Sequence, residues 1–156
     1  MRNVVTLLLL PMLCAFQVAA STQHQSLRFS KHVHEQCGIA VIDNAGELNF
    51  GQRYEGQALR FKLTSNRKGG RVLLKLVHFD IGSFEPVADR SQVHFRVDGA
   101  FRHQGDVDFW QQGVELQADV LRDYPEVTVS ARIDLQDYSA PAGEHYINME
   151  WGIECY

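Results

Sequence analysis

Hydrophobic and polar residues alternate with a period of two along most of this chain, which is the pattern of strands with one buried face. The clearest alternating runs are 59–63, 93–98 and 127–135, and the mostly apolar run 71–79 is long enough for a central strand. The last run, 147–155, places Ile147, Met149, Trp151, Ile153 and Cys155 on one parity. Many short strands therefore predict an all-β fold.

Turn signals separate these runs. Asn66-Arg67-Lys68-Gly69-Gly70 predicts a turn before the central strand, and Asp98-Gly99 is a hairpin signal. The segment 114–121 is ambiguous, because its apolar residues alternate while its Gln and Leu residues also suit a helix. Close turns and a single core together predict a β-sandwich. We expect its buried positions to include Ile39, Phe61, Leu74, Phe95, Val129 and Trp151.

The first twenty residues read as a secretory signal peptide. Arg2 gives a positive start, an apolar run follows, and Val18-Ala19-Ala20 supplies the small residues of a cleavage site. The run is shorter than the ~20 residues that span a bilayer, so we expect no membrane span after processing. The remaining chain, Ser21–Tyr156, is long enough for one domain with a real core. An exported protein of the periplasm, the cell surface or the medium is expected.

The predicted export determines which cysteines remain in the mature chain and whether they are oxidised. Cys14 lies within the signal peptide, which leaves Cys37 and Cys155 near opposite ends of the domain. An oxidising compartment favours a disulfide between them. Each shares its parity with apolar neighbours, so both thiols are expected to face the core. No C-x-x-C spacing supports a reactive thiol pair instead.

Charge narrows the range of partners. The net charge of −4 becomes −5 when Arg2 is removed with the signal peptide, and such an acidic balance argues against nucleic acid. Arg67, Lys68 and Arg71 form the one basic cluster. Because they flank two glycines, they are typical of a solvated hairpin tip.

The segment 21–36, called the arm below, is polar overall, but Leu27, Phe29 and Val33 fall on one parity. Three interpretations are open. The arm is the first strand of its own sandwich, or it is disordered, or it is donated to a neighbouring molecule along a sheet edge. In the last case Leu27, Phe29 and Val33 would contact the partner.

Few residues suggest chemistry. His32 and His34 would share one face of a strand, but two ligands make a weak metal site. Asp106 and Asp108 lack the ligand run of a calcium loop and read as an acidic hairpin edge. Phe109, Trp110 and Tyr124 lie in the least regular stretch, where they fill the core or bind a sugar or protein partner. We find no nucleophile motif and expect neither an enzyme nor a cofactor.

Two short motifs bracket the domain. Cys37-Gly38-Ile39-Ala40-Val41 is followed by Leu48-Asn49-Phe50-Gly51, and near the end Ala140-Pro141-Ala142-Gly143-Glu144-His145-Tyr146 leads into the last strand. Together they resemble the opening and the closing turn of chaperone–usher pilin subunits and of spore-coat-U-like domains. The resemblance implies an immunoglobulin-like β-sandwich that is completed by a neighbour's amino-terminal arm. It also implies a periplasmic chaperone and other fimbrial subunits as partners.

One feature departs from that family. Pilins bridge their first two strands, whereas here the partner of Cys37 is in the last strand, next to the place of a donor strand. Two functions follow from the sequence. The first is an exported, non-enzymatic fimbrial or fimbria-like subunit that assembles through strand donation. The alternative is a periplasmic or secreted β-sandwich module that binds a glycan or a protein through its loops.

Overall fold

The structure is a computed structural model that describes residues 28–156. The predicted signal peptide, 1–20, and Leu27 lie outside the described residues. Within them, contacts separate a body, Val33–Tyr156, from the segment that precedes it. Residues 28–36 form neither a helix nor a strand, and the first strand begins at Cys37.

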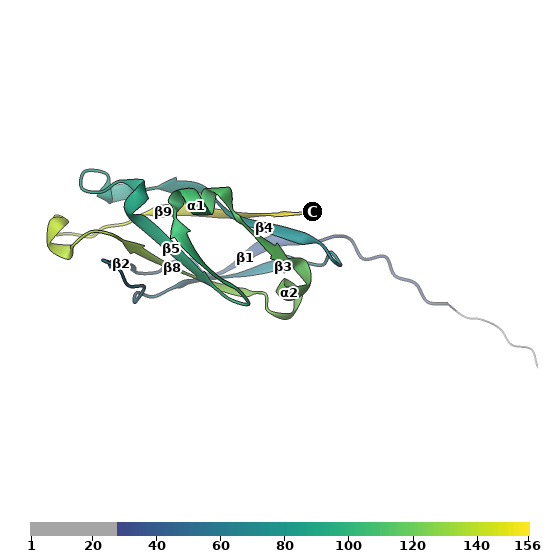
Figure 1. The fold of residues 1–156 in the computed structure, drawn as a ribbon. Coiled ribbons are helices and arrows are strands. Elements are labelled where there is room, and N and C mark those ends of the chain that lie inside the picture. Colours follow the sequence, from purple (N-terminus) through teal and green to yellow (C-terminus); the bar gives the residue numbers. More distant parts are fainter. Residues whose placement is uncertain (1–27) are drawn as a thin grey trace, which may run out of the picture. The chain divides into compact units, whose positions relative to one another are not determined.

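Two sheets form the body (Figure 1). The larger sheet has the order β1 (Cys37–Asp43), β3 (Leu59–Ser65), β8 (Glu126–Ile133), β5 (Val93–Asp98), β6 (Arg102–Asp106), with antiparallel neighbours throughout. The short β2 (Leu48–Phe50) pairs in parallel with β8. The smaller antiparallel sheet has the order β7 (Val114–Gln117), β4 (Arg71–Asp80), β9 (Asn148–Cys155). The predicted all-β class is therefore confirmed.

Short helices connect the strands. The two α-helices are α1 (Val107–Gln112) and α2 (Ala118–Asp123), and 3-10 turns occupy Gly82–Phe84, Arg90–Gln92 and Asp137–Ser139. The ambiguous segment 114–121 contains both structures, since β7 ends at Gln117 and α2 begins at Ala118. Its buried residues follow each period in turn: Val114 and Leu116 are two apart, and Ala118 and Leu121 are three apart.

The two predicted turns have different outcomes. Asp98-Gly99 lies in the β5–β6 hairpin, as predicted. The turn 66–70 is not a hairpin tip, because β3 and β4 do not pair with each other. It carries the chain from the larger sheet to the smaller one. The local sequence specifies a turn, but the strand that pairs next is chosen by long-range packing.

The core lies between the sheets. Phe61, Leu74, Phe95 and Val129 are buried as predicted, with Leu74 and Phe95 completely inaccessible. Ile39 and Trp151 are only partly buried, although both pack against the core cluster. They lie on β1 and β9, which are edge strands.

Candidate functional site

The first and last strands are both edge strands. Among residues 28–156, β1 pairs with β3 alone and β9 pairs with β4 alone, so each has one side without a hydrogen-bonded neighbour there. The two strands belong to different sheets and lie close to each other. The Cys37–Cys155 disulfide joins them directly. We call the strip between β1 and β9 the open edge.

Inward-facing side chains at the open edge lack cover. Leu63 and Phe61 of β3 are buried, but Ile39 and Val41, their cross-strand neighbours on β1, are not, and Val41 is 65% exposed. The same holds in the other sheet. Leu74 and Leu76 of β4 are buried, whereas their neighbours on β9, Ile153 and Trp151, are only half-buried. At the open edge, the inward-facing side chains are therefore buried on β3 and β4 but not on the edge strands β1 and β9.

This contrast has an energetic meaning. Burial of apolar surface contributes about 25 cal/mol of stabilising free energy for each Å² removed from water, and the exposed side chains of the open edge lack this contribution. An edge strand with free backbone groups is also a template for another strand. In addition, the buried indole N–H of Trp151 has no hydrogen-bond acceptor among the described residues. The open edge thus combines apolar side chains and unpaired backbone, which a β-strand would satisfy together.

A cavity widens the open edge at the end far from the disulfide. Its volume is about 370 Å³, and its apolar lining comes from both sheets and the segments next to them: Leu48, Leu59, Val129, Ala131, Ile147 and Met149. A second hollow of about 380 Å³ adjoins it, lined by Phe50 and Phe84 among others. The imidazole of His145 stacks on Phe84 and borders both hollows. The cavity is large enough to receive apolar side chains.

The disulfide closes the other end. The Cα atoms of Cys37 and Cys155 are 6.1 Å apart. Neighbouring strands lie about 4.8 Å apart, so a strand inserted between two others needs roughly twice that distance. A strand cannot lie between β1 and β9 at the bridge. Parity predicts that both thiols face the core, and their cross-strand neighbours Ser65 and Val72 are buried. Cys37 itself is exposed, at the start of the edge strand β1.

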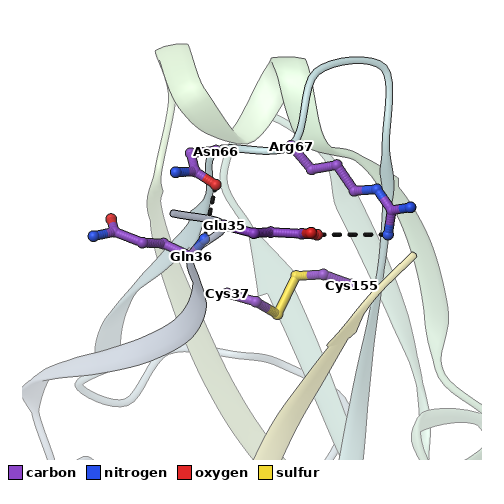
Figure 2. Close-up of a disulfide and its surroundings, with 6 residues drawn as sticks. All are labelled: Glu35, Gln36, Cys37, Asn66, Arg67 and Cys155. Atoms are coloured by element: carbon purple, nitrogen blue, oxygen red, sulfur yellow. Dashed lines mark hydrogen bonds and ion pairs between the residues drawn. A yellow bond between two sulfur atoms is a disulfide. The ribbon is translucent and has the colours of Figure 1, made fainter. Parts of the chain in front are cut away.

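Residues 34–36 are held against the turn that follows β3 (Figure 2). The backbone N–H of Gln36 donates to Oδ1 of Asn66 at 2.7 Å, and Nδ2 of Asn66 donates to the carbonyl of His34 at 2.7 Å. The backbone N–H of Asn66 donates to the carbonyl of Gln36 at 3.2 Å. Arg67 forms an ion pair with Glu35 at 3.5 Å. The end of the arm is thereby fixed to the body.

Two apolar residues of the arm, Phe29 and Val33, are solvent-exposed. Phe29 is 99% exposed and Val33 is 67% exposed. Arg28 and Lys31 make this segment basic, whereas the cavity at the open edge is bordered by Glu47 and Glu144. The arm is thus opposite in charge to the border of the cavity, and both the arm and the cavity contain apolar side chains.

The other candidate residues are separated in space or used locally. Asp106 caps α1, since its carboxylate accepts from the N–H of Phe109 at 2.8 Å, and Asp108 pairs with Arg90 at 2.9 Å. Within residues 28–156, no group of three or more His, Cys, Asp or Glu side chains is arranged to hold a metal ion. His32 and His34 are therefore not joined by a third ligand of these types among the described residues. Of the basic cluster, Arg67 pairs with Glu35 and Arg71 with Glu115.

The three loop aromatics divide between core and surface. Trp110 is completely buried, and its indole N–H donates to the carbonyl of Phe95 at 3.1 Å. Phe109 and Tyr124 are exposed. Tyr124 lines a surface hollow of about 600 Å³ next to the β5–β6 turn, with Val120 and Glu126. A sugar or protein partner would meet Tyr124 rather than Trp110.

The sequence did not predict one polar cluster that the structure contains. On the outer face of the larger sheet, the guanidinium carbons of Arg96 and Arg132 lie 4.9 and 5.3 Å from the ring centroid of Tyr54. Burial raises the pKa of Tyr54, against the opposing influence of Arg132. Asp98 pairs with Arg96, and Asp134 with Arg132. The cluster joins three distant segments whose charges compensate one another, which indicates a structural role.

Comparison of the chain with protein-family models, with curated proteins and with solved structures finds no match. No helix among the described residues is long and apolar enough to cross a membrane.

Proposed function

We propose that this protein is an exported, non-enzymatic fimbria-like subunit whose open edge receives the arm of a second copy. The observation that carries the proposal is the exposure of inward-facing apolar residues on β1 and β9, next to buried neighbours on β3 and β4. In this mode of recognition, main-chain hydrogen bonds supply affinity and pockets select alternate side chains. The arm offers Leu27, Phe29 and Val33 on one parity, with Lys31 at the position between Phe29 and Val33.

Strand order supports an immunoglobulin-like sandwich that lacks its final strand. In that fold the sheets are A-B-E-D and C-F-G. Here β1-β3-β8-β5 corresponds to the first set and β4-β9 to C and F, with β2, β6 and β7 as additions. The chain order of these six strands also agrees. The position of strand G, beside β9, is the open edge.

Charge and compartment support the same proposal. The basic arm is complementary to the acidic border of the cavity formed by Glu47 and Glu144. The disulfide is consistent with export to an oxidising compartment, as the predicted signal peptide 1–20 requires. A periplasmic chaperone would protect the open edge until assembly, because an exposed edge of this kind invites aggregation.

Removal of residues 21–32 is expected to abolish polymer formation and to leave the body folded, since every buried core residue lies in 61–133. The truncated protein should then bind a synthetic peptide of residues 21–36. Light scattering measures assembly, and tryptophan fluorescence reports binding because Trp151 lies at the open edge. A truncated protein that melts at lower temperature and binds no peptide would contradict strand donation.

Val41→Arg is expected to lower the affinity for this peptide by at least tenfold without unfolding the body. Val41 faces the open edge and is already 65% exposed, so the charge is solvated until a strand must cover it. Ala40→Arg is the matched control, because Ala40 is the exposed neighbour on the opposite face. Titration calorimetry of both variants measures the difference. Equal affinities would show that the peptide binds elsewhere.

The alternative function, a module that binds a glycan or a protein through its loops, is favoured by a different observation. The hollow beside Tyr124 presents an exposed aromatic ring with Val120 and Glu126. Aromatic rings of this kind stack on sugars and on protein partners. A monomer that remains complete and stable at high concentration, and that binds no arm peptide, would support this function instead.

A further inference from the structure

Asn66 makes an unusual set of contacts for a turn residue. Its side-chain amide accepts from the N–H of Gln36 and donates to the carbonyl of His34, and its own backbone N–H donates to the carbonyl of Gln36. The side-chain amide of asparagine can accept at Oδ1 and donate from Nδ2 at the same time. Asn66 therefore holds three backbone polar groups of the arm where the arm joins the body.

These contacts set the direction of the chain. β1 pairs with β3 as far as Cys37 and Ser65, and the bond from Asn66 to Gln36 extends that pairing by one residue. Residues 34–36 therefore leave β1 without reversing. For Val33 and Phe29 to enter the open edge of their own body, the chain would have to reverse within residues 34–36, and the three hydrogen bonds would break.

The disulfide opposes the same movement. It lies at the end of the open edge where the arm begins, and its Cα–Cα distance of 6.1 Å leaves no room for a strand between β1 and β9. Figure 2 shows Glu35 next to the bridge and directed toward Arg67, and the backbone of Gln36 next to Asn66. The arm is thus held at the closed end, whereas the cavity lies at the other end.

We infer that Asn66 is the positioning residue that keeps the arm out of its own open edge and presents it to a second copy. This inference rests on the proposed function. Its physical basis is the competition between insertion within one molecule and insertion between molecules. A tethered arm has a high effective concentration near its own body, so self-insertion would win unless the tether geometry forbids it.

The test compares Asn66→Ala and Asn66→Asp with Arg67→Ala in the full mature chain. Arg67→Ala is the matched control, because it removes the exposed ion pair to Glu35 and leaves the Asn66 contacts intact. Asn66→Asp can still accept from Gln36 but cannot donate to His34. Two readouts are needed: hydrogen exchange at the Gln36 amide, and the protein concentration that gives half-maximal assembly.

Asn66→Ala is expected to accelerate exchange at Gln36 at least tenfold and to raise the half-assembly concentration about tenfold, since one or two lost hydrogen bonds are worth about that factor. Below that concentration, Asn66→Ala should also bind added arm peptide more weakly than the wild type, because its own arm competes. Asn66→Asp should be intermediate, and Arg67→Ala should behave like the wild type.

Two results would overturn the inference, and they differ in what else they imply. If the wild type assembles and Asn66→Ala assembles at the same concentration with unchanged peptide binding, only the role of Asn66 is refuted. If the wild type neither assembles nor binds the arm peptide, the proposed function fails as well. Unchanged exchange at Gln36 in Asn66→Ala would also refute the role of Asn66, because the arm would then be held by other contacts.

Discussion

Replacing both cysteines, Cys37→Ser with Cys155→Ser, is expected to lower the free energy of unfolding by about 4–5 kcal/mol. The bridge spans 118 residues, so its loss restores much conformational freedom to the unfolded chain. It also joins edge strands of opposite sheets that share no hydrogen-bonded pairing. Total stabilities are about 5–15 kcal/mol, so this is a large share.

Urea denaturation of the double variant and of the oxidised wild type measures this effect. Wild-type protein treated with a reductant is the control for the chemical change itself, because it removes the bridge without substitution. The two should agree within about 1 kcal/mol. A loss below about 1 kcal/mol in both samples would mean that β1 and β9 are held together by contacts other than the bridge.

Trp110→Ala is expected to lower the free energy of unfolding by about 3–5 kcal/mol. Trp110 is completely buried, and its ring contacts Phe109 and Trp151 with centroid distances of 5.2 and 5.1 Å. Its truncation leaves a cavity and an unpaired carbonyl at Phe95, which accepts the indole N–H. The effect should exceed that of Trp151→Ala, because Trp151 is only half-buried at the open edge.

Phe109→Ala is the matched control for this substitution. Phe109 is the preceding residue of α1 and is 37% exposed, so its truncation removes less buried area. We expect less than half the loss seen for Trp110→Ala. Denaturant unfolding of both variants makes the comparison. Equal losses would indicate that α1 contributes through its backbone rather than through the burial of Trp110.

Most of the strands were predictable because their signal is local. Period-two alternation assigned 59–63, 93–98 and 127–135, since a strand with one buried face imposes that pattern on its own residues. The disulfide was also predictable, because two cysteines remain after the predicted signal peptide is removed. The mixed segment 114–121 was not, since β7 and α2 each contain too few residues to establish a period.

By itself the sequence determined the class of the fold, the positions of its main strands and the cysteine pair, because these depend on neighbouring residues and on counts. Only the tertiary structure decided that the turn 66–70 crosses between sheets and that Val41 and Trp151 lie at an uncovered edge. The same is true of the contacts of Asn66. Alternation shows which face of a strand points inward. Whether anything covers that face depends on strand order, which is set by contacts between residues far apart in the chain.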